Sequence, residues 1–427
     1  MKETDAVITG LGLATPLGNG VEVSWGAVKA QTSGIRHVPR RGVPDCFQYA
    51  GRVDEIAAAE AGPASLAAQK KFLNRGALLG LAAAGEAVSH AGIRLEAVPP
   101  ERRALFIASG DFTRAGCDSF YPAFKESTDA SWSKTDADRL NRATLSGVTP
   151  FVLLESIANN LFSYLSACFE FRGPNTSLAS LSPYGSQALE LACRVIEQRR
   201  ADVALVVGYC SWVNDIALYE LEGLGLLSKC RSGAASFRPF DRARDGFIPG
   251  EGGAALFLEA ETLARRRAAA TLARVRGSAN RIKPTLDLGV APNVTEETMR
   301  AALEEARREP KELAFVCGHG SATSKGDRSE LGALGALFHD AGSAPVCGLK
   351  SYCGHMGAAS DLAEIVWSIK AVAAGLVPGT LNFRETEADF SGVPISARHR
   401  PTNKRLFLSS SYGMGGQSSA IVIEVEP

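Results

Sequence analysis

Short apolar runs alternate along the chain with longer stretches of helical periodicity. Buried strands are predicted at residues 6–9, 103–109, 176–181, 202–207, 254–260, 313–320 and 345–351, and a final strand pair ends in AIVIEV at residues 420–425. Helices are predicted at residues 64–93, 150–169, 183–199, 261–270, 328–338 and 357–374, from apolar content and helical spacing. Residues 111–143 are polar and are predicted to form an irregular surface excursion or a loop that faces a partner. Strands that alternate with helices predict a layered α/β fold.

The charged amphipathic segment ETLARRRAAA at residues 261–270 is the best place to divide the chain. It separates a predicted N-terminal half, residues 1–260, from a C-terminal half, residues 261–427, and each half alternates strands with helices. A chain of 427 residues is long enough for two domains or for one duplicated domain. No sequence identity is visible between the halves, so the pattern alone does not predict an internal repeat.

Ser182 lies where a predicted strand passes into a predicted helix. Pro183 follows it and suits the first helical position, because its missing N–H has no partner there anyway. The free amides and the positive dipole end of that helix would stabilise an anion that develops beside the Ser182 hydroxyl. The same position suits a serine that only caps the helix. This stretch therefore leaves both interpretations open, a nucleophile and a capping residue.

Composition and charge exclude several classes of function. The chain carries 46 basic and 46 acidic residues, so its net charge provides no attraction to nucleic acid or to an anionic membrane. No run approaches the ~18 apolar residues of a membrane span, and MKETDAVITG lacks the basic and apolar regions of a signal peptide. The nine cysteines include no CxxC pair, and several lie in apolar runs. We therefore expect reduced core cysteines, no metal site and a cytoplasmic location.

The segment GLGLATPLGNG, directly after the first predicted strand, is superficially similar to a dinucleotide-binding loop. Its third glycine is missing, Pro16 interrupts the expected helix, and no suitably placed acidic residue follows a second strand. We therefore predict no nucleotide cofactor.

Two of the six histidines occupy unusual settings. His319 lies in CGHGSAT and His355 in KSYCGHM, each after an apolar run and beside glycine, so each imidazole is expected at an accessible strand end. Lys350 opens the second of these segments. The turn SYGMGG, which contains Gly413 and Gly415, offers backbone N–H groups of the kind that form an oxyanion hole. Together these residues predict a catalytic site.

The motifs resemble those of β-ketoacyl-acyl carrier protein synthases of the KAS II type, in the thiolase-fold superfamily. The resemblance extends over essentially the whole chain, in the segments VITGLGLATPLGNGVEVSW, GPN, FDRARDGFIPGEGGAALFLE, GHGSATSKGD, LKSYCGHMGAASDLAE and SYGMGGQSSA. It implies a duplicated fold with α/β/α/β/α layers. It also implies decarboxylative Claisen-type chemistry on acyl and malonyl groups carried by the phosphopantetheine of an acyl carrier protein, with no bound cofactor or metal ion.

The resemblance also implies roles for single residues. His319 and His355 match the family's histidine pair, which binds a malonyl thioester carbonyl and stabilises the enolate formed on decarboxylation. Lys350 matches a family lysine, and Glu364 and Asp327 match acidic residues that support the site. Two neutral imidazole donors can hold an oxyanion without becoming charged themselves.

Two positions depart from the family pattern. Met414 stands where the family has a gating phenylalanine, whose backbone N–H joins that of the nucleophile in the oxyanion hole. Ser182 stands where the family has its nucleophilic cysteine, and Leu181, Pro183 and Tyr184 replace small neighbours. A serine hydroxyl needs a well-aimed general base, whereas a cysteine is partly ionised at neutral pH. We therefore expect elongation by the isolated chain to be weak or absent.

Three functions follow as hypotheses. The first, which we favour, is a synthase-family enzyme that decarboxylates malonyl-carrier protein at the two histidines, transfers acyl groups slowly through Ser182, and works in a heterodimer. The second is a non-elongating partner of a cysteine-bearing ketosynthase, similar to the chain-length factors of type II polyketide synthases. The third, a serine acyltransferase or hydrolase, is disfavoured because SLSPYG lacks the first glycine of G-x-S-x-G. The resemblance implies an acyl carrier protein as partner, and a homodimer or heterodimer formed through the strand near residues 177–180.

Overall fold

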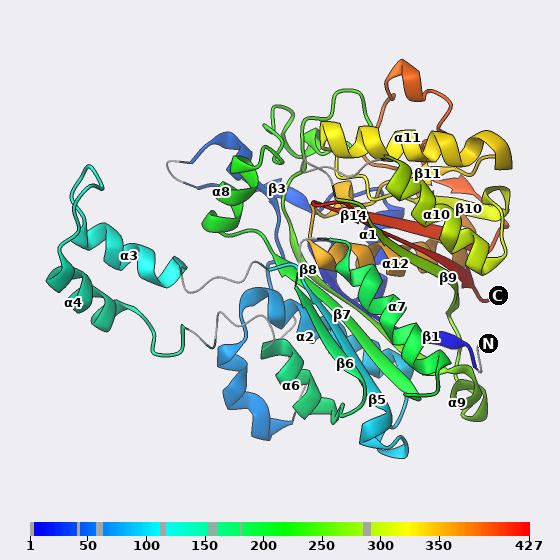
Figure 1. The fold of residues 1–427 in the computed structure, drawn as a ribbon, viewed down its shortest axis with the longest axis horizontal. Coiled ribbons are helices and arrows are strands. Elements are labelled where there is room, and N and C mark those ends of the chain that lie inside the picture. Colours follow the sequence, from blue (N-terminus) through cyan, green and yellow to red (C-terminus); the bar gives the residue numbers. More distant parts are fainter. Residues whose placement is uncertain are drawn as a thin grey trace.

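Two sets of strands form the framework of the computed structural model (Figure 1), which describes residues 4–40, 43–56, 63–111, 117–152, 154, 160–179, 182–284 and 292–427. The N-terminal set contains β1 (Ala6–Thr15), β5 (Arg103–Ser109), β6 (Asn175–Ala179), β7 (Val203–Ser211) and β8 (Glu251–Ala260). The C-terminal set contains β9 (Ala273–Ile282), β10 (Leu313–Cys317), β11 (Val346–Cys347), β14 (Leu406–Gly413) and β15 (Gln417–Val425). The shorter strands are β2 (Gly18–Asn19), β3 (Ile35–His37), β4 (Tyr49–Gly51), β12 (Leu376–Val377) and β13 (Arg400–Pro401).

Helices connect and cover these strands. They are α1 (Val21–Lys29), α2 (Arg75–Ala91), α3 (Cys117–Ser127), α4 (Ala137–Gly147), α6 (Asn160–Phe169), α7 (Tyr184–Glu197), α8 (Asp215–Gly223), α9 (Glu261–Arg266), α10 (Pro292–Ala306), α11 (Ser324–Ala341) and α12 (Ala358–Ala373). The 3₁₀ turns are η1 (Asp45–Phe47), η2 (Ala64–Phe72), η3 (Leu95–Ala97), η4 (Pro100–Arg102), η5 (Gly233–Ser236), η6 (Pro310–Glu312), η7 (Lys350–Tyr352) and η8 (Ala388–Phe390).

The same strand order occurs in both sets. The N-terminal set runs β6-β5-β7-β8-β1 and the C-terminal set β11-β10-β14-β15-β9. In each set the first three strands are mutually parallel and the last two pairings are antiparallel. β1 pairs with β9 through Val7 opposite Arg274 and Ile8 opposite Ala273, which joins the sets into one sheet. The topology thus confirms the duplicated fold that the family resemblance implies and that the apolar pattern alone did not predict, whereas the division of the chain at residue 260 stays a prediction.

The central helices α7 and α12 form a layer that contacts both sets of strands. α7 contacts β5 and β7 of the first set and β9 and β15 of the second, while α12 packs on β7, β8 and β14 and also on α7. Helices α2 and α6 cover the outer face of the N-terminal set, and α10 and α11 cover that of the C-terminal set. Within β7, Ala204 and Val206 join the central core and Leu205 and Val207 join the outer one. Burial on both faces explains why these strands are continuous apolar runs.

Helices α3 and α4 occupy the segment for which irregular structure was predicted. Figure 1 shows this pair standing apart from the body of the molecule. The side chain of Asp136 accepts a hydrogen bond from the backbone N–H of Arg139 and caps α4. Large apolar residues of the pair face away from the core, since Tyr121 and Leu145 are 54% and 87% exposed. The prediction of irregular structure was therefore wrong, while the surface position is confirmed.

Several helix boundaries also differ from the expected ones. Pro183 is the N-cap of α7, one position before the first helical residue, and residues 180 and 181 lie outside the described part. The predicted helix at residues 64–93 divides into η2 and α2, because the side chain of Asn74 caps α2 at the backbone N–H of Ala77. Of the predicted helix at 150–169, α6 covers Asn160–Phe169, and residues 153 and 155–159 lie outside the described part.

The cysteines and the helices bear on two further expectations. The eight cysteines whose side chains are described form no disulfide, and all but the half-buried Cys168 are buried. Within the described ranges, no helix combines the length and hydropathy needed to cross a membrane. The cytoplasmic location expected from the sequence stays a prediction.

Candidate active site

A cavity of about 490 Å³ opens where the two halves of the fold meet. Its volume lies within the range of small-molecule sites. The predicted site residues that line it come from distant parts of the chain: Ser182, His319, His355, Gly413 and Met414. Further lining residues include Trp212, Phe247, Ser321, Thr323 and Tyr412. The structure therefore brings the turn before α7, the end of β10, the segment after η7 and the glycine-rich turn to one cavity. His319 follows β10 as expected, but the expected strand at 345–351 is only Val346–Cys347, and His355 lies beyond η7 and not at a strand end.

Ser182 sits at the base of this cavity, just before α7. It is 3% exposed, and its Oγ donates a hydrogen bond to Oδ1 of Asp361 at 3.2 Å. The first turns of α7 and α12 pack closely, since a Cβ added at Gly185 would lie 2.5 Å from the carbonyl oxygen of Ala358. Glycine at residue 185 therefore allows the carboxylate on α12 to reach the hydroxyl before α7.

His319 is fixed through its backbone. Its N–H donates to Oε1 of Glu330 at 2.7 Å, and the N–H of Gly320 donates to Oε2 of the same side chain at 2.9 Å. The carbonyl oxygen of His319 accepts a hydrogen bond from Nζ of Lys350 at 2.7 Å. Its ring packs on that of Tyr412 with 4.2 Å between centroids, and its buried Nδ1 has no hydrogen-bond partner among the described residues. The Nδ1 atom of His319 is therefore available for a hydrogen bond to a ligand.

His355 is fixed through its ring. Its Nδ1 accepts a hydrogen bond from the backbone N–H of Gly357 at 3.1 Å, so a neutral ring carries its proton on Nε2. Gly357 adopts φ of 51°, which favours glycine and turns its N–H back toward the ring. The rings of Trp212 and Phe247 pack against His355 with centroids 5.0 and 4.9 Å away. The Nε2–H is therefore the donor left for a ligand.

The two imidazoles form a pair of uncharged donors. Their ring centroids are 5.3 Å apart in an edge-to-face arrangement. Burial, the charge of Lys350 and the second imidazole lower the pKa of His319 well below its usual 6.5. Burial and Lys350 likewise lower the pKa of His355 well below 6.5. Both rings are therefore neutral at pH 7, the state in which they can donate to an oxyanion without a charge of their own.

Lys350 and Glu364 form a fully buried ion pair beside the cavity. Nζ of Lys350 lies 2.8 Å from Oε2 of Glu364. Burial acts to lower the pKa of Lys350, but the carboxylates of Glu364 and Asp361 outweigh it and raise this pKa. Burial raises the pKa of Glu364 to about 7, against the opposing effect of Lys350. Lys350 is absent from the residues that line the cavity, so its contact with the site runs through the His319 carbonyl.

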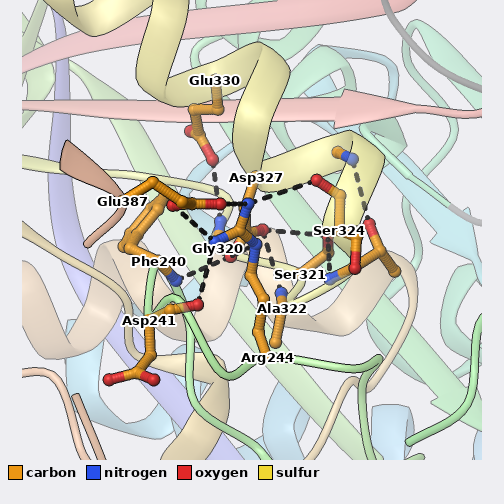
Figure 2. A network of polar contacts seen from close by, with 12 residues as sticks. Phe240, Asp241, Arg244, Gly320, Ser321, Ala322, Ser324, Asp327, Glu330 and Glu387 are labelled. Atoms are coloured by element: carbon orange, nitrogen blue, oxygen red, sulfur yellow. Dashed lines mark hydrogen bonds and ion pairs between the residues drawn. The ribbon is translucent and has the colours of Figure 1, made fainter. Parts of the chain in front are cut away.

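Asp327 organises the loop that follows His319 and does not touch either imidazole. Figure 2 shows its carboxylate surrounded by donors: the backbone N–H groups of Phe240 at 2.6 Å and Ala322 at 2.9 Å, and Oγ of Ser321 at 3.1 Å. Burial raises its pKa to about 6, opposed by these donors and by the nearby Arg244. Asp327 thus supports the loop that carries Ser321 and Thr323 to the cavity wall.

The glycine-rich turn closes the cavity on the side of Ser182. A Cβ added at Gly413 would lie 1.9 Å from the carbonyl oxygen of Ser182, so the two backbones are in direct contact. Met414 is half-buried and lines the cavity. Gly415 adopts φ of 93°, is exposed and is not among the lining residues. Gly413 and Met414 therefore border the site, and Gly415 shapes the turn behind them.

Sequence reasoning missed several residues of the site. Asp361, Glu330, Tyr412, Trp212 and Phe247 contact the predicted residues but were not singled out. A signal existed for Asp361, a charged residue six positions after His355 in an otherwise apolar helix start. No signal in the sequence marked the aromatic residues, because a single aromatic residue in an apolar run cannot be distinguished from an ordinary core residue.

Comparison with known protein families agrees with this geometry. The N-terminal domain of β-ketoacyl synthases matches residues 3–264, and the C-terminal domain of the same enzymes matches residues 272–384. The chain belongs to the β-ketoacyl synthase family. The resemblance drawn from the motifs is thereby confirmed at the level of the family, whereas the roles of single residues are addressed below as proposals.

Relatives and solved structures align over nearly the whole chain. The tetracenomycin polyketide synthase ketoacyl synthase alpha subunit of Streptomyces glaucescens is 30% identical, over 98% of this chain and 97% of that protein. The 3-oxoacyl-[acyl-carrier-protein] synthase 2 of Coxiella burnetii is 26% identical, over 99% of each. A structure of the ishigamide ketosynthase/chain length factor superposes with a TM-score of 0.84 at 23% identity, covering 99% of this chain and 100% of that one. The chain has the thiolase-like ketosynthase fold, as expected.

Proposed function

We propose that this chain is a ketosynthase-type subunit of a type II polyketide or fatty-acid pathway that binds acyl and malonyl groups on an acyl carrier protein. The single observation that carries the proposal is the pair of neutral imidazoles, 5.3 Å apart, on the cavity that Ser182 also lines. Two relatives are named for this chemistry, one as a ketoacyl synthase alpha subunit and one as a 3-oxoacyl-[acyl-carrier-protein] synthase. One fold neighbour is titled as a ketosynthase in complex with its acyl-carrier protein.

In the proposed reaction the carbonyl oxygen of a malonyl thioester accepts hydrogen bonds from His319 and His355. These donors stabilise the enolate that remains when the carboxylate leaves as carbon dioxide, and a proton then converts the enolate to an acetyl thioester. Lys350 acts as a positioning residue, because it holds the His319 carbonyl and its positive charge adds to the effect of burial in keeping both rings neutral. The proposed chemistry uses no bound cofactor or metal ion.

Ser182 takes the place of the family's cysteine in this proposal. Since a serine hydroxyl is a weaker nucleophile than a thiol unless a base activates it, we expect decarboxylation to outpace elongation in the isolated chain. The N–H of Met414 beside Gly413 is the proposed second donor of the oxyanion hole, as the turn lies against the Ser182 carbonyl.

Release of carbon dioxide tests the proposal. The wild-type chain is incubated with malonyl-N-acetylcysteamine and with malonyl-acyl carrier protein, and carbon dioxide and the acetyl product are quantified. We expect His319→Ala to lower the rate about 100-fold, the usual loss of one oxyanion donor. His339→Ala, on the exposed face of α11, is the matched control and is expected to keep the wild-type rate. No carbon dioxide from the wild type with either probe would contradict the proposal.

A second candidate is a non-elongating partner subunit in a heterodimer with a cysteine-bearing ketosynthase. The observation that favours it is the serine at residue 182, together with a fold neighbour titled ketosynthase/chain length factor. The proposed dimer contact is β6, which is an end strand of the sheet. Co-purification with a cysteine-bearing ketosynthase, and carbon dioxide release only in its presence, would support this candidate over an independent enzyme.

A further inference from the structure

Asp361 is a buried carboxylate directly behind the Ser182 hydroxyl. It is fully buried in the first turn of α12, and it is not among the residues that line the cavity. Its Oδ1 accepts hydrogen bonds from Oγ of Ser182 at 3.2 Å and from Oγ of Ser411 at 2.9 Å. The Ser182 hydroxyl therefore donates its proton away from the cavity, and this orients the oxygen's lone pairs toward a ligand.

The surroundings of Asp361 keep the carboxylate available as a base. Burial raises its pKa, while Lys350 and the hydrogen bonds from Ser411 and Ser182 act in the opposite direction. The start of a 16-residue helix favours a negative charge at this position. A raised pKa makes the ionised form of this carboxylate a stronger proton acceptor than a carboxylate in water, and the bonded Ser182 hydroxyl is the alcohol within its reach.

We propose that Asp361 is the general base that activates Ser182, so that the pair transfers acyl groups from thioesters to the serine. The inference rests on the proposed function, because it assigns the acyl-transfer step of the same site. It accounts for the serine at residue 182, since the helix terminus that ionises a thiol does not ionise an alcohol and a base must take its place.

The step balances without any further reagent. Oγ of Ser182 attacks the thioester carbonyl as its proton moves to Asp361, and the oxyanion forms beside the amides of the glycine-rich turn. The carbon–sulfur bond then breaks, and the proton held by Asp361 ends on the leaving thiol. The products are an ester on Ser182 and a free thiol, with nothing oxidised or reduced.

Covalent labelling of the full chain by hexanoyl-N-acetylcysteamine tests this assignment. Intact-mass and peptide analysis should find a hexanoyl ester on Ser182, absent from Ser182→Ala. Asp361→Asn keeps the size and an acceptor oxygen but removes the base, so we expect labelling at least about 100-fold slower. Asp361→Ser, which is smaller, gives a second test if the first variant unfolds, as judged by circular dichroism and melting temperature.

The same substitution in the Ser182→Cys background distinguishes a general-base role of Asp361 from a purely structural role. A carboxylate beside a thiol disfavours the thiolate, so Asp361→Asn should leave labelling of the Ser182→Cys variant unchanged or faster. A structural role would slow both backgrounds equally, and that result would overturn the proposal. So would an unlabelled wild type, or labelling of Asp361→Asn at the wild-type rate. Carbon dioxide release from malonyl-N-acetylcysteamine by the wild type reports separately on the proposed function.

Discussion

Gly413 is packed onto the backbone of Ser182, with no room for a side chain between them. A Cβ on Gly413 would lie 1.9 Å from the Ser182 carbonyl oxygen, far inside van der Waals contact. The contact joins the end of β14 in the C-terminal half to the turn before α7 in the N-terminal half. The position of the serine thus depends on a glycine 231 residues later in the chain.

Gly413→Ala should therefore damage both stability and the site. A methyl group must push the Ser182 carbonyl away, and such overpacking costs about 1–3 kcal/mol of unfolding free energy. We expect a lower midpoint in urea unfolding and slower labelling of Ser182 by hexanoyl-N-acetylcysteamine. Gly26→Ala in α1 is the matched control, because a Cβ there meets nothing within 4 Å. It should be neutral or stabilising by up to about 1 kcal/mol, and equal behaviour of the two variants would contradict the packing argument.

The strands were predictable because each one is a continuous apolar run in the sequence. Alternate residues of β7 face two different apolar layers, so the whole strand is apolar and is recognisable without its neighbours. The duplication was not predictable from the apolar pattern, since strand order and direction repeat while the side chains differ, and only the family resemblance implied it. Helices α3 and α4 were missed for the opposite reason, because several of their large apolar residues, Tyr121, Phe124 and Leu145, are exposed and produce no core-facing pattern.

The site was predictable only as a set of separate segments. His319 and His355 stood out because glycine flanks each of them after an apolar run. Asp361 was missed because its importance lies in a contact with Ser182 across 179 positions, which no local pattern records. The same holds for Glu330, whose two bonds to the backbone around His319 depend on how α11 packs.

Lys350→Met should destabilise the protein strongly. It leaves Glu364 buried without its partner, and breaking a buried ion pair from one side costs about 3–5 kcal/mol. The double variant Lys350→Met with Glu364→Leu should recover much of this loss, because no unpaired charge remains. Lys370→Met is the control, since Lys370 pairs with the exposed Glu22 and such pairs contribute less than about 1 kcal/mol. Urea unfolding measures all three, and a Lys350→Met variant as stable as Lys370→Met would refute the argument.

Glu330→Gln should change how stability depends on pH. Burial raises the pKa of Glu330 from 4.5 to about 8, so between these values the folded protein holds a proton that the unfolded chain releases. The contribution of this group to stability is thus greatest at low pH and falls as the pH rises from about 4.5 to about 8. Glutamine does not ionise. Between pH 5.5 and pH 8.5 the unfolding free energy of the wild type should therefore fall by roughly 1 kcal/mol or more relative to that of Glu330→Gln. The melting temperatures of the two proteins, measured across this range, should show the same trend. Glu312→Gln, at the surface, is the control and should show no such trend, because the hydrogen bond from the backbone N–H of Glu309 holds the pKa of Glu312 below its usual value and so outside this pH range. A constant difference between wild type and Glu330→Gln would mean that Glu330 is ionised throughout, held by the two backbone N–H groups it accepts from His319 and Gly320.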